Sequence, residues 1–212
     1  MKRIPIIATV IAALAFAGTA AAALEPWTFV DSGATCSVVS TFNNGVLHLE
    51  KNCSTSTVAA AGASITGMGG QTFISGSFTL ASTSECQGGS PRFNVVTSDG
   101  TFFLGCNNVT PTINGDGTAT YTFTAATIAD AGGQVQFPTG TITSIDVLID
   151  VQGAADLSAI TVNGTLEVPA TGPTAKSQCK KGGWRNFTSP KFRNQGQCVA
   201  WYEHHRTAHN GR

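Results

Sequence analysis

The chain has 212 residues, of which 42% are hydrophobic and 11% are charged, and its formal net charge at pH 7 is zero. The charges are divided unevenly, because residues 24–170 contain eleven acids and two cations, whereas residues 171–212 contain one acid and eight cations. This uneven distribution of charge indicates two parts of different electrostatic character. We do not expect nucleic acid to be a partner of the chain.

The first 23 residues have the pattern of a secretory signal peptide. Two cations, Lys2 and Arg3, precede an apolar run over residues 4–16, and small residues follow up to Ala23. This order predicts cleavage after Ala23. The alternative is a membrane anchor, which the run disfavours because it is shorter than the ~20 residues that span a bilayer. We therefore expect a secreted, extracellular protein with no membrane span after cleavage.

The six cysteines agree with export. An even number in an exported chain predicts three disulfides, and six cysteines allow 15 pairings. Their spacing favours bridges between neighbours in the sequence: Cys36–Cys53, Cys86–Cys106 and Cys179–Cys198. The residues up to 168 contain no Cys-x-x-Cys motif or Cys/His cluster, so we expect no metal site of that kind and no cofactor. Calcium at turn residues remains an alternative, with Asp99, Asn114 and Asp116 as candidate ligands.

Residues 24–168 are predicted to form a β-sandwich domain. Apolar and polar residues alternate, as in half-buried strands; in 74–81, for example, Ile74, Phe78 and Leu80 share one face. Turn residues that tolerate positive φ separate the runs. No run before residue 175 has a helical period. The predicted strands are 27–30, 37–40, 45–51, 63–66, 74–81, 92–97, 101–104, 118–125, 144–151 and 159–166. The pattern favours an all-β antiparallel sandwich, jelly-roll-like.

A resemblance supports this fold. The segment 146–164, Asp-Val-Leu-Ile-Asp-Val-Gln-Gly-Ala-Ala-Asp-Leu-Ser-Ala-Ile-Thr-Val-Asn-Gly, resembles the closing strands of jelly-roll carbohydrate-binding modules and galactose-binding-like domains. The resemblance implies a fold and leaves the ligand open.

The C-terminus is predicted to be a separate module. Residues 169–177 have linker composition, and residues 178–212 form a basic, disulfide-closed segment. The stretch 179–199, with its Cys-Lys-Lys-Gly-Gly-Trp start and Asn-Gln-Gly-Gln-Cys-Val end, resembles a short tail of secreted bacterial proteins. That resemblance implies a secreted bacterial protein with a tail of unassigned chemistry.

Burial alone cannot stabilise so small a module. We expect the Cys179–Cys198 bridge to hold a core of Trp184, Phe187, Phe192 and Trp201. Asn194 is expected to cap a helix from Gln195 to about His205. The candidate cationic residues are Lys180, Lys181, Arg185, Lys191 and Arg193. Three interpretations of these cations stay open. They could form a solvated surface, bind an anionic polymer by charge, or dock on the acidic β domain.

No catalytic constellation stands out. Asp146 and Asp150 lie ~13 Å apart on a strand, too far for glycoside hydrolysis by themselves. His48 is predicted to be exposed beside Glu50. Glu203, His205 and His209 could bind a metal on a helix but are better explained as a polar tail. We therefore expect a non-catalytic binding or surface-associated protein for a polysaccharide or an anionic cell-envelope polymer, with Trp27 and Trp184 as candidate aromatic contacts. A structural protein and a polysaccharide hydrolase are the alternatives.

Overall fold

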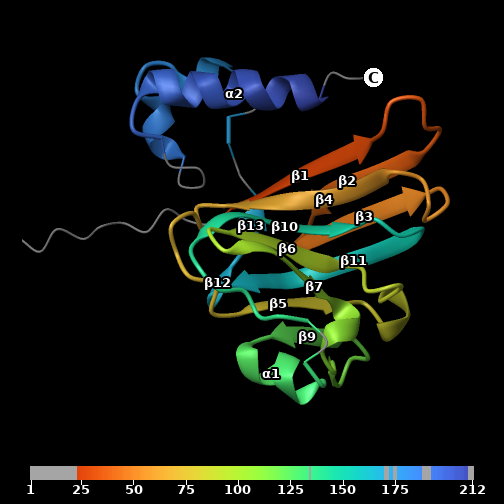
Figure 1. Cartoon of the computed structure of the whole chain (residues 1–212). Coiled ribbons are helices and arrows are strands. Elements are labelled where there is room, and N and C mark those ends of the chain that lie inside the picture. The colour runs from red at the N-terminus through yellow and green to blue at the C-terminus, as the bar shows by residue number, and fades with distance from the viewer. Residues whose placement is uncertain (1–22, 134, 170–171, 174–175, 188–191, 210–212) are drawn as a thin grey trace, which may run out of the picture.

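A computed structural model describes residues 23–133, 135–169, 172–173, 176–187 and 192–209. The chain is mostly β, with two sheets stacked in a β-sandwich-like architecture (Figure 1). The predicted signal peptide lies outside the described residues, apart from Ala23. No helix in the described ranges is long and apolar enough to cross a bilayer.

The six-stranded sheet has the order β13-β1-β4-β10-β6-β7. Its neighbours are antiparallel except for β13 and β1, which run parallel. Its strands are β1 (Ala23–Val30), β4 (Ala59–Thr66), β6 (Arg92–Thr97), β7 (Gly100–Gly105), β10 (Ile142–Ile149) and β13 (Val168–Pro169).

The second sheet is antiparallel, with the order β2-β3-β11-β5-β9-β8 and β12 paired to β11. Its strands are β2 (Ser37–Asn43), β3 (Val46–Asn52), β5 (Gly76–Leu80), β8 (Thr112–Ile113), β9 (Ala119–Phe123), β11 (Gly153–Val162) and β12 (Thr165–Leu166). We call it the seven-stranded sheet.

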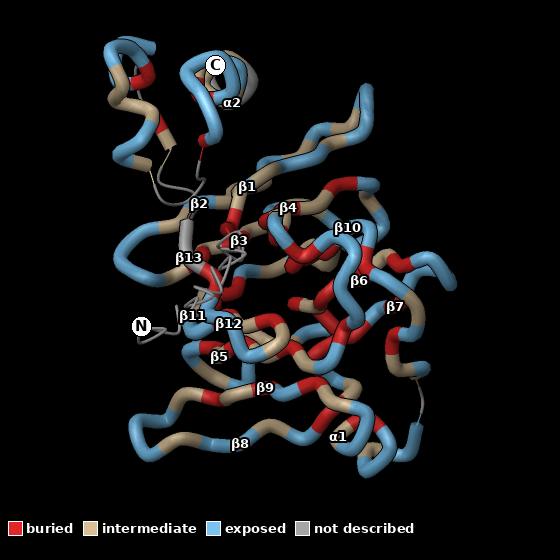
Figure 2. The backbone as a smooth tube through the Cα atoms, turned by 90° about the vertical axis from the view of Figure 1, so that its left-hand side faces the viewer, coloured by how far each residue is buried: buried red, intermediate tan, exposed pale blue. Residues whose placement is uncertain are grey.

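The core lies between the two sheets. Figure 2 shows the buried segments gathered there, with exposed loops around them. Phe78 is at the centre, with ring centroids 5.4–5.7 Å from those of Phe93, Tyr121 and Phe123. Alternation explains this core, because every second residue of a strand faces inward.

The three predicted disulfides are all present: Cys36–Cys53, Cys86–Cys106 and Cys179–Cys198. The first joins the open ends of the β2–β3 hairpin. The second joins the turn after η1 (Thr83–Glu85) to η2 (Cys106–Asn108), which follows the β6–β7 hairpin. These two bridges therefore join segments near paired strands, whereas the third joins η3 (Lys176–Cys179) to the helix α2 (Gln195–His209).

Two expectations for the sandwich are wrong. Ile74 is 68% exposed, because β5 begins only at Gly76 and the Asn163 side chain holds the Ile74 amide in the preceding turn. A short helix, α1 (Ala125–Asp130), interrupts the strands. Thr124 caps α1, since its hydroxyl accepts a hydrogen bond from the Thr127 amide while Thr127 bonds back to the Thr124 amide.

The C-terminal residues form a small cluster of their own. It contains two 3-10 turns, η3 (Lys176–Cys179) and η4 (Gly183–Asn186), and the helix α2 (Gln195–His209). The expected Asn194 cap is confirmed, because its side chain accepts a hydrogen bond from the Gln197 amide at 2.8 Å. Phe192 is buried with the Cys179–Cys198 bridge, and Trp184, Phe187 and Trp201 pack against them.

Part of the predicted linker is packed. Pro173 is buried, and a Cβ at Gly172 would clash with the Trp201 ring. Lys176, which belongs to η3, forms an ion pair with Glu203 of α2 at 2.9 Å. This stretch therefore lies against the aromatic cluster of the tail.

Candidate functional site

The outer faces of the two sheets differ in chemistry. On the seven-stranded sheet, hydroxyl groups pair across strands, as in Ser77–Thr161 at 2.7 Å and Thr79–Thr120 at 2.8 Å. On the six-stranded sheet, the outward positions carry aromatic, carboxylate, amide and guanidinium groups. The second face therefore offers the more varied contacts for a ligand.

Strand register places these groups in two rows that cross five strands, β1, β4, β10, β6 and β7. One row consists of Trp27, Gly62, Leu148, Arg92 and Gly105, and the other of Glu25, Ser64, Asp146, Asn94 and Phe103. The residues next to them on β4, β10, β6 and β7 belong to the core, so both rows face outward. We call the two rows together the outer strip. It spans roughly 19 Å, given a strand spacing of about 4.8 Å.

Trp27 lies across the sheet at a point where β4 has no side chain. A Cβ at Gly62 would be 2.7 Å from both the Trp27 ring and the Leu148 Cβ. The indole N–H donates to Asp146 Oδ1 at 3.1 Å, and the Ser64 hydroxyl donates to the same oxygen at 2.6 Å. The indole is thus held in one orientation by β1, β4 and β10 and remains partly exposed.

Arg92 is fixed in a similar way at the other side of the strip. Its guanidinium donates to both Asp150 oxygens at 2.6 Å, and its Nε donates to Asn94 at 2.8 Å. Burial alone would raise the pKa of Asp150, but Arg92 and the Ser90 hydroxyl outweigh it and hold this pKa below its usual value. Phe103 is 52% exposed, and the Arg92 guanidinium lies 5.5 Å from its ring centroid.

A shallow groove of ≈ 370 Å³ adjoins Arg92 and Phe103. Its other walls are Gly88, Gly89, Gly105, Asn107, Asn108 and Val135. Asn108 is structural, since its side chain accepts a hydrogen bond from the Gly105 amide at 2.7 Å. Asn107 is exposed and lies close to Gly89, where a Cβ would be 2.9 Å from its Oδ1. The groove therefore combines an aromatic ring, a guanidinium and an amide.

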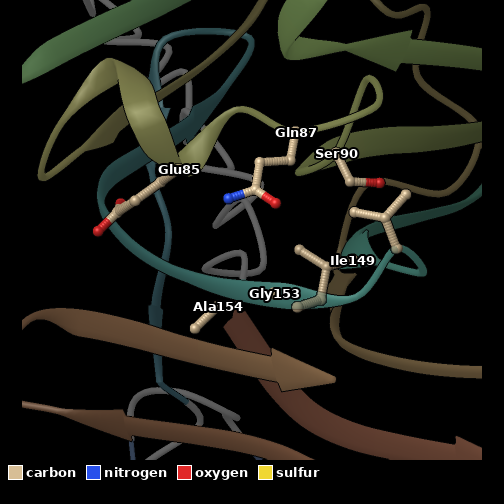
Figure 3. A pocket seen from close by; sticks show the side chains of 7 residues that line it. Glu85, Gln87, Ser90, Ile149, Gly153 and Ala154 are labelled. Atoms are coloured by element: carbon tan, nitrogen blue, oxygen red, sulfur yellow. The ribbon is translucent and has the colours of Figure 1, made fainter. Parts of the chain in front are cut away.

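A second cavity is too small for a substrate. It has ≈ 10 Å³ of space, room for about one water molecule. Figure 3 shows Gln87 and Ser90 on one side of it and Ile149, Gly153 and Ala154 on the other, with the Glu85 carboxylate turned away.

His48 was expected to be exposed beside Glu50, and the structure adds a closer partner. His48 Nδ1 lies 2.7 Å from Asp156 Oδ1, while its Nε2 lies 3.8 Å from Glu50. Burial raises the pKa of Glu85, although its carboxylate also accepts hydrogen bonds from the Asp156 and Ala81 amides. The described lining of the two cavities includes neither His48 nor Asp156.

The side chains predicted as calcium ligands form hydrogen bonds within the turns to which they belong. Asp116 accepts hydrogen bonds from the Thr118 amide and hydroxyl, and Thr118 thereby holds the pKa of Asp116 below its usual value. Asn114 donates to Thr118 and Thr120, and Asp99 accepts from Ser98. Within the described ranges, no three His, Cys, Asp or Glu residues are grouped to hold a metal ion.

The cationic residues of the tail are only partly brought together. Lys180, Lys181 and Arg185 are exposed near one turn, where the Arg185 guanidinium lies 4.5 Å from the Trp184 ring centroid. Arg193 is exposed at the start of α2, and Lys191 lies outside the described residues. Trp184 therefore packs against the buried cluster of the tail, and the Arg185 guanidinium lies over its ring.

Sequence reasoning identified Trp27 but missed its partners. The contacts Trp27–Asp146 and Arg92–Asp150 join residues 119 and 58 positions apart. Alternation placed Asp146 on an outward face, and only the strand order shows which strands lie beside it. No protein-family model matches this chain, and comparisons with curated proteins and with solved structures gave no significant match either.

Proposed function

We propose that the protein is an exported, non-catalytic binding protein that holds a neutral polysaccharide chain on the outer strip. The observation that carries this proposal is the fixed Trp27 indole, laid across Gly62 beside Asp146 and Ser64. Sugar rings stack their apolar faces on aromatic rings, while carboxylate and amide groups accept and donate hydrogen bonds to the hydroxyls.

The charges of the strip favour a neutral ligand. Arg92 is the only cation of the two rows, and Asp150 already neutralises it. The Asp146 carboxylate is bound by the neutral donors of Trp27 and Ser64, so a uronate polymer would meet like charge there. The strip is also long enough for several sugar units.

The strand order supports a jelly-roll assignment for the sandwich. Taken in chain order, β3, β4, β5, β6, β7, β9, β10 and β11 divide into the sheets β3-β11-β5-β9 and β4-β10-β6-β7. Numbered along the chain, these are 1-8-3-6 and 2-7-4-5, the arrangement of two interlocked Greek keys. The three disulfides and the leader-like first 23 residues support export.

The decisive experiment titrates the protein with soluble β-glucan, xylan, galactomannan and polygalacturonate by calorimetry. We expect binding to at least one neutral polymer, and a loss of about tenfold in affinity for Trp27→Ala and for Phe103→Ala, equal to about 1.4 kcal/mol each. Gly62→Ala should weaken binding as well, because its Cβ displaces the indole without removing it.

The matched control is Ile113→Ala, which alters an exposed apolar residue on the seven-stranded sheet. It should bind like the parent protein. Unchanged affinity in the Trp27→Ala and Phe103→Ala double variant would refute the strip as the site, and so would exclusive binding to polygalacturonate.

A second candidate function is attachment of the basic tail to an anionic polymer. The observation in its favour is the grouping of Lys180, Lys181 and Arg185 around one turn, with Arg185 Nη1 3.1 Å from the position of a Cβ at Gly182. This function is compatible with the first, since the two surfaces belong to different clusters. A hydrolase activity has less support, because Asp146 is bound by Trp27 and Ser64 and Asp150 is bound by Arg92. A structural role without a ligand is the other alternative.

A further inference from the structure

Glu167 is the least explained residue of the sandwich. It lies between β12 and β13 and is 3% exposed, and neither of its carboxyl oxygens has a hydrogen-bond partner among the described residues. Burial raises the pKa of Glu167 to about 7, and the nearby Val162 backbone lowers it only in part. Buried polar groups are almost always bonded, so this carboxyl calls for a partner.

No side-chain cation of the sandwich is available for it. Residues 23–169 contain only two Lys or Arg residues, Lys51 and Arg92. The Lys51 ammonium is buried and donates to the carbonyls of Thr57, Asp150 and Thr55, and Arg92 is bound to Asp150. The remaining histidine of this range, His48, contacts Asp156.

The chain itself supplies another cation at this place. β13 pairs in parallel with the start of β1, so that Ala23 lies beside Val168 and Leu24 beside Pro169. From the strand spacing and rise, the Cα of Glu167 is roughly 6 Å from that of Ala23 and roughly 8 Å from that of Leu24. A glutamate side chain can reach a main-chain nitrogen over this distance. Ala23 and Leu24 are themselves buried.

We propose that the Glu167 carboxylate is the receptor for the α-ammonium group of a mature N-terminus at Leu24. A processing peptidase would hydrolyse the Ala23–Leu24 amide bond. The oxygen of water goes to the Ala23 carbonyl carbon, and the Leu24 nitrogen gains protons to become an ammonium group. That group has three N–H donors and a positive charge, which match a buried carboxylate. The inference rests on the proposed export of the chain and is independent of glycan binding.

Two chains test this inference. One begins at Leu24. The other retains Ala21, Ala22 and Ala23, so that its α-ammonium group lies three residues away from Leu24. The carboxyl carbon of Glu167 is followed by NMR over a pH titration. In the extended chain it should titrate near neutral pH. In the chain beginning at Leu24 the midpoint should fall by at least one pH unit, a tenfold weaker proton affinity. Equal midpoints in the two chains would overturn the proposal.

A second measurement separates pairing from general packing. Glu167→Gln keeps the shape and removes the charge, and the proposal expects it to lower the unfolding midpoint in denaturant only in the chain beginning at Leu24. Destabilisation of both chains to the same extent counts against an ion pair. N-terminal sequencing of protein exported from cells should give Leu24, and a mature N-terminus further along the chain would also overturn the proposal. Glycan binding by the same samples shows separately whether the outer strip functions.

Discussion

At the scale of single residues, Lys51 is the clearest structural cation. Its side chain is 1% exposed, and its ammonium donates to Thr57 and Asp150 carbonyls at 2.7 Å and to the Thr55 carbonyl at 3.3 Å. These carbonyls belong to the β3–β4 loop and to the β10–β11 turn, so one side chain ties two loops at the same end of the sandwich. Its three N–H groups match three acceptors.

We expect Lys51→Met to lower the free energy of unfolding by about 3 kcal/mol, because three carbonyls lose a charged donor that is itself buried, while the volume is kept. Denaturation in urea measures the change. Lys176→Met is the matched control: its ion pair is with Glu203 and its side chain is 50% exposed, so its loss should cost less than about 1 kcal/mol. Equal effects of the two substitutions would contradict the structural role of Lys51.

At the scale of elements, the alternation of apolar and polar residues predicted the strands well. β6 agrees at both ends, and each of the other nine predicted runs corresponds to an observed strand with shifted bounds. The largest shift is at β11, which begins at Gly153 rather than at Ala159. Ala154, Ala155 and Asp156 show little alternation of apolar and polar side chains. The strand extends over them because they pair with β3.

The elements that were missed are those whose cause is not periodic. β8 and β13 have two residues each, too few for any alternation, and β12, also of two residues, lies within the predicted run 159–166 but forms a separate strand. The six residues of α1 contain only one buried side chain, Ile128, so their helical period is not visible, although the Thr124–Thr127 capping box could have signalled a start. The hydrogen bonds between strands on the outer strip could not be found either, because they depend on strand order.

The tail depends on its disulfide more than the sandwich does. Two of the three buried residues in its cluster are the bonded Cys179 and Cys198. We expect the Cys179→Ser/Cys198→Ser variant to lose about 3 kcal/mol, enough to unfold α2. Far-UV circular dichroism should then show loss of helix, while the unfolding midpoint of the sandwich stays unchanged.

The matched control is Cys36→Ser/Cys53→Ser, which removes a bridge of similar loop length from the β2–β3 hairpin. It should lower the midpoint of the sandwich and leave the helix signal in place. If opening the tail bridge also lowers the sandwich midpoint, the two clusters do not unfold independently.

At the scale of the whole molecule, the opposite charges of the two parts matter. Eleven acids lie in residues 24–170 and eight cations in residues 171–212. We expect retention on an immobilised anionic polymer, such as polygalacturonate, to fall steeply with salt and to drop further in the Lys180→Gln/Lys181→Gln/Arg185→Gln variant. The same variant should bind neutral polysaccharide like the parent protein. Unchanged retention of the variant would show that these three cations do not bind the polymer and only face solvent.

The position of β10 and β11 has a consequence for how the molecule is assembled. Although they are the last long strands in the chain, β10 lies between β4 and β6, and β11 lies between β3 and β5. The six-stranded sheet cannot join its two halves before residue 149 has been synthesised, and the seven-stranded sheet cannot do so before residue 162, so the earlier strands keep open edges until then. Closure of the sandwich therefore waits for two strands from the end of the domain, and the contacts that they make join segments far apart in the sequence, which slows folding.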